Sequence, residues 1–279
     1  MQSQQIPRES SIMINQKIET SLGQMAVTAS FPIFPKATLF FWSGMFFDGT
    51  MWDPILEMFY ADYNVVVIDP PGHGGSHSPQ NIFSIAECAT IVSEILGHYH
   101  LDSCIFVGLS WGGFVGQSFV KFFPQKCNGL VLINTCASAP TTFEKIVFSI
   151  LPSLLSRFGV KSFEGTLANA LLSKSTAMNN HALMAKLRNA LRFLDYNALK
   201  PTLLSVMKHR ENLVDCIETQ DLKCLVIWGN QDNSISKSRS SELISLTPTK
   251  AKIKELDVGH NAVLEAPKEV TSALLEFLE

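Results

Sequence analysis

Short and almost wholly apolar runs, separated by helical stretches, limit most strongly what this chain can fold into. The runs are Thr38–Trp42, Val65–Ile68, Cys104–Val107, Leu130–Ile133 and Leu225–Trp228. Strands that helices cover on both faces have this pattern, because neither face meets water. A less apolar run, Ala251–Asp257, predicts one more strand nearer the edge of the sheet.

Segments with helical periodicity lie between these runs. They are Ser84–His98, Trp111–Phe123, Ser236–Leu246 and Ala266–Leu278. Strand and helix alternate, so we expect an α/β fold with a mostly parallel sheet flanked by helices. Near the start, Ser11–Glu19 and Gly23–Ser30 predict an antiparallel hairpin at one edge of that sheet.

The alternation breaks between Thr135 and Ile217, where leucine-rich amphipathic patterns follow one another without a convincing strand. We interpret residues 135–217 as a helical cap inserted into a core made of residues 1–134 and 218–279. The charges of this cap are expected on its solvated face. They include Arg157, Lys161, Lys186, Arg188 and Arg192.

Composition argues against several classes of partner. The formal charge of -3 comes from 22 basic and 25 acidic residues that are interspersed, with no basic stripe for nucleic acid. The longest apolar run, Ala37–Phe47, is about half the ~20 residues that span a bilayer. We therefore expect a small-molecule substrate, no nucleic acid and no membrane span, whereas oligomeric state does not follow from the sequence.

Cysteine usage and the first residues bear on location and metal binding. The six cysteines are scattered and form neither a Cys-x-x-Cys pair nor a cluster with histidine, which favours a reducing compartment and no metal site. Met1–Ser10 is polar and lacks the basic start and apolar core of a secretory signal. A cytoplasmic location is expected.

A serine lies where an apolar strand turns into a helix. Ser110 stands between Gly108 and Gly112, directly after Cys104–Val107 and before a helical pattern. At such a tight turn the hydroxyl projects beyond the sheet, and a β-carbon on the flanking residues would collide with neighbouring backbone. Ser110 is therefore predicted to be a nucleophile, which needs a general base.

Two later loops supply a base and an acid. Asp232 follows the run that ends at Trp228, and His260 follows the next predicted strand, 28 residues later. One helix and one strand fit that interval and would bring both loops to the same edge of the sheet. Asp232 could instead cap the helix that starts near Ser236, and His260 could be a loop histidine satisfied by backbone.

Three motifs carry a resemblance that spans nearly the whole chain. Gly108–Gly113 (GLSWGG), Trp228–Asp232 (WGNQD) and Val258–His260 (VGH) resemble the catalytic elements of the α/β-hydrolase superfamily. Asp69–Ser76 (DPPGHGGS) is similar to a turn of that superfamily. Gly108–Gly113 with Leu130–Thr135 (LVLINT) is also similar to the 3-oxoadipate enol-lactonase group and its esterase relatives.

The resemblance implies an oxyanion hole made of the backbone N–H groups of Trp111 and Met45. The superfamily usually has a histidine where this chain has Ser43, while Gly44 is retained. Trp42 and Phe46 flank the expected site and predict contacts with an apolar acyl or alkyl group. His73 is expected to shape the glycine-rich turn that follows Asp69.

The predicted function is hydrolysis of a carboxylic ester, thioester or lactone of a small, largely apolar substrate through an acyl-enzyme, without metal or organic cofactor. Ser110 would be the nucleophile, His260 the base and Asp232 the orienting acid. Two alternatives stay open: a carbon–carbon bond hydrolase of the same fold, and a ligand-binding homologue without activity, which Ser43 favours.

Overall fold

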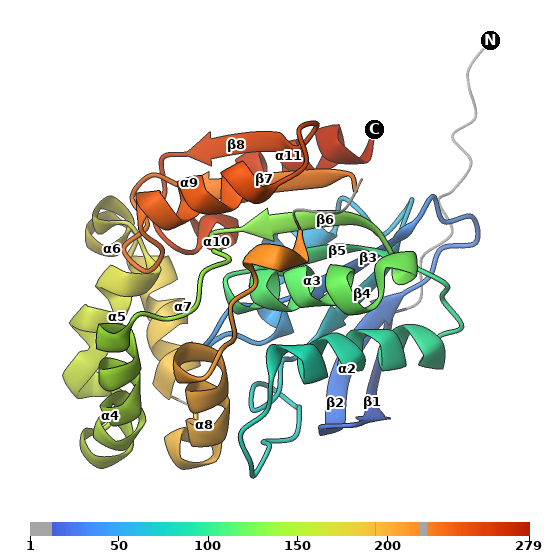
Figure 1. Cartoon of the computed structure of the whole chain (residues 1–279). Coiled ribbons are helices and arrows are strands. Elements are labelled where there is room, and N and C mark those ends of the chain that lie inside the picture. Colours follow the sequence, from blue (N-terminus) through green and yellow to red (C-terminus); the bar gives the residue numbers. More distant parts are fainter. Residues whose placement is uncertain (1–12, 193, 218–221) are drawn as a thin grey trace.

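One eight-stranded sheet forms the centre of the protein (Figure 1). The computed structural model describes residues 13–192, 194–217 and 222–279. The strand order is β1-β2-β4-β3-β5-β6-β7-β8, in which β2 runs antiparallel to both neighbours and the other pairs are parallel. The strands are β1 (Met13–Thr20), β2 (Gly23–Ser30), β3 (Thr38–Trp42), β4 (Asn64–Ile68), β5 (Cys104–Leu109), β6 (Cys127–Ile133), β7 (Cys224–Gly229) and β8 (Lys252–Leu256).

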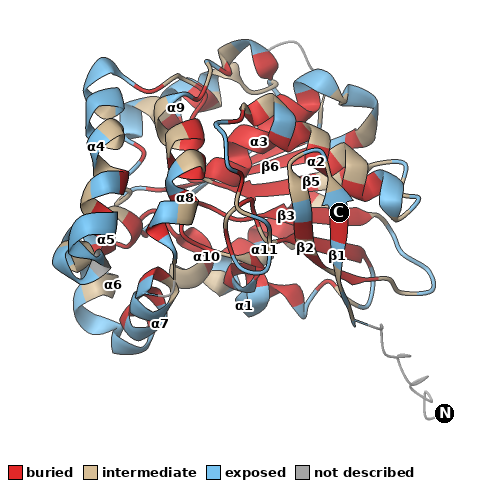
Figure 2. Cartoon of the chain, turned by 90° about the horizontal axis from the view of Figure 1, so that it is seen from below, coloured by how far each residue is buried: buried red, intermediate tan, exposed pale blue. Residues whose placement is uncertain are grey.

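Helices cover the faces of this sheet. They are α1 (Asp53–Leu56), α2 (Ile85–His98), α3 (Trp111–Phe122), α9 (Lys237–Leu246), α10 (Ala262–Glu265) and α11 (Pro267–Leu278). In one group α2 packs against α3, and in another α1, α10 and α11 pack together. Figure 2 shows the central strands almost wholly buried, as their continuous apolar runs require.

The α/β fold class and the mostly parallel sheet are confirmed. Every predicted strand is present, although several begin or end one to three residues away from the expected limits. The expected hairpin forms between β1 and β2, and the predicted start of its first strand at Ser11 lies outside the described residues. The residues Met1–Ser10 also lie outside them.

Helices are the only regular elements in the described part of the chain between β6 and β7. They are α4 (Thr142–Phe158), α5 (Glu164–Leu171), α6 (Lys174–Asn179), α7 (His181–Arg192) and α8 (Tyr196–Leu203). In Figure 1 they form a separate group at one end of the sheet. The five charged side chains expected on the solvated face of this segment are all exposed.

Single turns complete the secondary structure. They are the 3₁₀ helices η1 (Gly49–Trp52), η2 (Pro124–Lys126), η3 (Val160–Phe163) and η5 (Val214–Cys216), and the π-helical turn η4 (Leu204–Lys208). Of the helices in the described ranges, none combines the length and apolarity needed to cross a membrane.

Backbone crosses closely where β5 turns into α3. A β-carbon on Gly108 would overlap the backbone of Gly112, and one on Gly112 would overlap the carbonyl oxygen of Trp42 at the end of β3. Both obstacles are backbone atoms, so no side-chain rotation can relieve them. The glycines predicted to flank the turn are therefore required by its packing.

Gly112→Ala is expected to destabilise the fold by about 3 kcal/mol, because the new methyl group must displace the end of β3. Gly97→Ala is the matched control, since it lies in α2 and its β-carbon would meet nothing within 4 Å. That substitution should stabilise the protein by about 0.5–1 kcal/mol. Urea unfolding of the two variants measures both effects, and equal stabilities would contradict the packing argument.

Candidate active site

Ser110 has a strained backbone conformation at the start of α3. Its φ of 53° and ψ of -107° are rare for a residue with a side chain, and such strain costs about 1–3 kcal/mol. Hydrogen bonds hold it in place: Ser110 N–H donates to the Ile133 carbonyl, and Thr135 Oγ1 donates to the Ser110 carbonyl, both at 2.9 Å. The turn thereby aims the Ser110 hydroxyl beyond the carboxyl end of β5.

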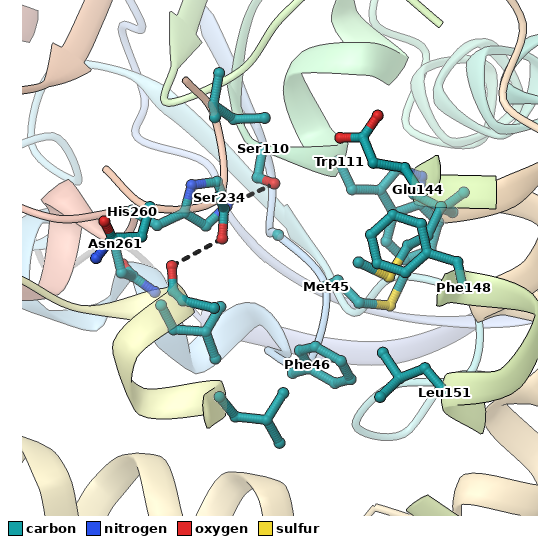
Figure 3. A pocket seen from close by; sticks show the side chains of 18 of the residues that line it. Met45, Phe46, Ser110, Trp111, Glu144, Phe148, Leu151, Ser234, His260 and Asn261 are labelled. Carbon is teal, nitrogen blue, oxygen red and sulfur yellow. Dashed lines mark hydrogen bonds between the residues drawn. The ribbon is translucent and has the colours of Figure 1, made fainter. Parts of the chain in front are cut away.

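An imidazole meets this hydroxyl from another loop (Figure 3). His260 Nε2 lies 2.9 Å from Ser110 Oγ, and His260 Nδ1 lies 2.8 Å from Asp232 Oδ2. The side chains of His260 and Asp232 are only 6% and 3% exposed. A carboxylate can only accept, so Nδ1 carries the proton and the Nε2 lone pair is left to accept from the serine.

Asp232 is held by hydrogen bonds on both carboxylate oxygens. Oδ1 accepts from the N–H groups of Ser234 at 2.7 Å and Ile235 at 2.9 Å, and Oδ2 accepts from His260 and from Asn134 Nδ2 at 2.9 Å. Burial alone would raise the pKa of Asp232, but His260 and these hydrogen bonds outweigh it and lower the pKa. The carboxylate thus holds its own turn and faces the histidine. It does not cap α9, the alternative role, because its backbone donors precede that helix, which begins at Lys237 after the N-cap Ser236.

Asn134 is a site residue that the sequence reasoning missed. It follows β6 with a left-handed φ of 46°, and its Nδ2 also donates to the Gly259 carbonyl at 3.1 Å. One amide therefore ties the loop of Asp232 to the loop of His260. The sequence signal that could have revealed Asn134 is its position directly after the apolar run that forms β6. This strand is the neighbour of β5, which precedes Ser110.

The loop after β3 lies beside Ser110 and carries the predicted oxyanion donor. Phe46 has a φ of 75°, and its N–H donates to His73 Nε2 at 3.0 Å. The N–H groups of Met45 and Trp111 have no protein acceptor among the described residues. The N–H groups of Met45 and Trp111 are thus free to bind a ligand oxygen, whereas the N–H of Phe46 is already bonded to His73.

Two side chains hold this loop. Ser43, which stands where a histidine was expected, is buried and donates from Oγ to the Asp48 carbonyl at 2.8 Å. His73 lies 3.1 Å from the Pro71 carbonyl through Nδ1, so that nitrogen donates and Nε2 accepts from Phe46. Burial lowers the pKa of His73 to about 4, which keeps it neutral. His73 shapes its own turn, as expected, and supports the loop as well.

A cavity of about 380 Å³ opens above Ser110 and His260. Met45, Phe46 and Trp111 line it together with Phe148 and Leu151 of α4, and in Figure 3 Met45, Trp111, Phe148 and Leu151 lie across from His260. Its walls are mostly apolar.

Trp42 is not among the residues that line the cavity, so its expected contact with substrate is corrected. The side chain is fully buried, and its ring packs edge-on against Trp111 with the ring centroids 5.7 Å apart. The reason is its position: Trp42 is still part of β3, whereas Phe46 lies beyond the strand end. Trp42 therefore supports Trp111 from within the core.

Comparison with known proteins gives a family match and several relatives. A family model described as alpha/beta hydrolase fold matches residues 38–267. The chain is 33% identical over 86 residues to a poly(3-hydroxyalkanoate) depolymerase of Ectopseudomonas oleovorans, which covers 31% of this chain and 30% of that protein. It is also 33% identical over 88 residues to 3-oxoadipate enol-lactonase 2 of Acinetobacter baylyi, covering 32% and 33%.

These alignments span only about a third of the relatives' length. Among solved structures, an esterase from Thermogutta terrifontis is similar at a TM-score of 0.85 and 22% identity, with 95% of this chain and 98% of that chain covered. At that identity the likeness concerns the fold.

The buried His73 predicts a pH dependence of stability. Below about pH 6.5 the unfolded chain protonates this imidazole, whereas the native protein resists protonation until about pH 4. Native stability should therefore fall by roughly 3 kcal/mol as the pH drops between these values. Urea unfolding across this range should show a flatter pH dependence of stability for His73→Gln than for the unmodified protein. Parallel curves for His73→Gln and the unmodified protein would refute the assignment.

Proposed function

The chain belongs to the alpha/beta hydrolase fold family, and on that premise we propose that it is a serine hydrolase of a carboxylic ester, thioester or lactone. The observation that carries the proposal is the continuous set of hydrogen bonds from Ser110 Oγ through His260 to Asp232. We further propose a small substrate with a largely apolar body, since the cavity beside Ser110 is mostly apolar.

The first step is acylation of Ser110. His260 Nε2 accepts the hydroxyl proton as Oγ attacks the carbonyl carbon, and Asp232 stabilises the imidazolium that forms. The carbonyl oxygen becomes negative and accepts from the N–H groups of Met45 and Trp111. The tetrahedral intermediate then expels the alcohol, thiol or lactone oxygen, which takes the proton from His260.

The second step is hydrolysis of the acyl-enzyme. A water molecule takes the position of the leaving group, and His260 accepts one of its protons as the oxygen attacks the acyl carbon. The second tetrahedral intermediate collapses, returns the proton to Ser110 Oγ and releases the acid. Each step uses only groups of this chain and water.

We propose that residues 135–217 form a cap over the site, with residues 1–134 and 218–279 as the core. Phe148 and Leu151 of α4 line the cavity together with core residues such as Ser110, which supports this division. A cap in that place would shield the acyl chain from water and select its size. The limits rest on the end of β6 at Ile133 and the start of β7 at Cys224.

Replacement of the triad residues tests the mechanism. Ser110→Ala and His260→Ala should each lower kcat by roughly four to six powers of ten on p-nitrophenyl esters. Asp232→Asn should lower it by roughly four powers of ten, because the amide favours the wrong tautomer. Ser234→Ala is the matched control: this serine also lines the cavity, but its Oγ donates to the Ala170 carbonyl at 2.8 Å.

A fluorophosphonate probe should label the unmodified protein and Ser234→Ala but not Ser110→Ala. Wild-type rates for Ser110→Ala would refute the nucleophile. Labelling together with inertness toward every ester, thioester and lactone would favour the carbon–carbon bond hydrolase. The absence of both labelling and turnover would favour the ligand-binding homologue.

A further inference from the structure

Three charged side chains line the cavity beside the proposed nucleophile and its base. Glu144 of α4 forms an ion pair with Arg239 of α9, in which Nη1 and Nη2 each lie 2.9 Å from one carboxylate oxygen. In this bidentate ion pair, the charge of Glu144 is neutralised by Arg239. Among the described residues no other acidic side chain lines the cavity, so Arg210 faces it without a carboxylate of its own.

Arg210 is a buried cation with unused donors. The residue is only 6% exposed. Its Nη1 donates to the Ser138 carbonyl at 2.7 Å, and its Nη2 lies 3.9 Å from the Cys136 sulfur. Its Nε has no partner among the described residues. Buried arginines are normally paired, because an unpaired charge away from water is costly.

The surroundings fix the position of the guanidinium. Its central carbon lies 3.9 Å from the centroid of the Phe114 ring, which also lines the cavity. Burial lowers the pKa of Arg210, but a guanidinium keeps its proton in the working pH range. The Asp232 carboxylate does not line the cavity and is engaged in four hydrogen bonds of its own. One positive charge in the cavity wall is therefore left for a ligand to neutralise.

We propose that Arg210 is a carboxylate-binding residue, and that the preferred substrate is an ester, thioester or lactone which carries a free carboxylate apart from the bond that is cleaved. This inference rests on the proposed function and adds its substrate class. A carboxylate suits the site because its two oxygens match the planar guanidinium fork, and its single charge balances a single cation. The apolar walls would hold the carbon chain between the carboxylate and the reacting carbonyl.

The test compares three sets of p-nitrophenyl esters with acyl chains from butanoate to octanoate. The first set has the plain alkyl chains, the second has the terminal methyl group replaced by a carboxylate, and in the third that carboxylate is capped as a methyl ester. At the chain length that reaches Arg210, kcat/KM for the free carboxylate should exceed that for its capped form by roughly tenfold to a hundredfold.

Substitutions then test whether Arg210 causes the preference for the free carboxylate. Arg210→Met should abolish the ratio between free and capped esters, and Arg210→Lys should keep part of it, since an ammonium retains the charge but not the fork. Lys208→Met is the matched control: it removes a cation two residues away that does not line the cavity, and the ratio should stay unchanged. Thermal unfolding of each variant confirms that it is folded.

The outcomes separate this inference from the proposed function. If the protein hydrolyses the plain alkyl esters and Ser110→Ala does not, the proposed hydrolase is supported, whatever the ratio of kcat/KM between free and capped carboxylates. If the unmodified protein prefers the capped or alkyl ester at every chain length, the carboxylate subsite is wrong while the hydrolase stands. The same conclusion follows if folded Arg210→Met keeps the wild-type ratio. The comparison of esters on the unmodified protein decides the matter even if Arg210→Met does not fold.

Discussion

The close crossing of β3 with the turn between β5 and α3 is the constraint on which the site depends. Gly112 passes so near the Trp42 carbonyl that a β-carbon has no space there. That contact and the hydrogen bonds to Ile133 and Thr135 keep Ser110 at a positive φ. The strain is local, and the buried sheet beneath it provides the stability that maintains it. The Ser110 hydroxyl is thereby held at a fixed position.

Hydrogen bonds between loops do the rest of the positioning. Asn134 bonds to Asp232 and to the Gly259 carbonyl, and so ties together the loops that follow β6, β7 and β8. On the other side of Ser110, His73 accepts the Phe46 N–H and leaves that of Met45 free. Because the side chains of Asn134, Asp232 and His73 are buried and already hydrogen-bonded, they hold these loops in place without a ligand, which is the condition for electrostatic stabilisation of a transition state.

Local pattern was enough to predict the strands, the limits of α2, α3, α9 and α11 to within one residue, and the loops of Ser110, Asp232 and His260. Continuous apolar runs are buried most completely in a sheet that helices cover on both faces. Parallel strands bring the loops that follow them to one edge of the sheet. The expected contact of Trp42 with substrate was wrong, because proximity in sequence to Phe46 does not tell which side chain still belongs to the strand. Asn134 was missed since its role depends on partners 98 and 125 residues away.

The sequence by itself determined the α/β architecture and the order in which serine, acid and histidine follow the strands, because both depend on short-range periodicity and on turns. Only the tertiary structure decided which polar atoms meet. Ser43 and His73 share the support of one loop, and Arg210 lies buried without a carboxylate beside Phe114. Hydrogen bonds and the desolvation of charge depend on distances of a few ångströms between residues remote along the chain, and those distances exist only once the core has packed.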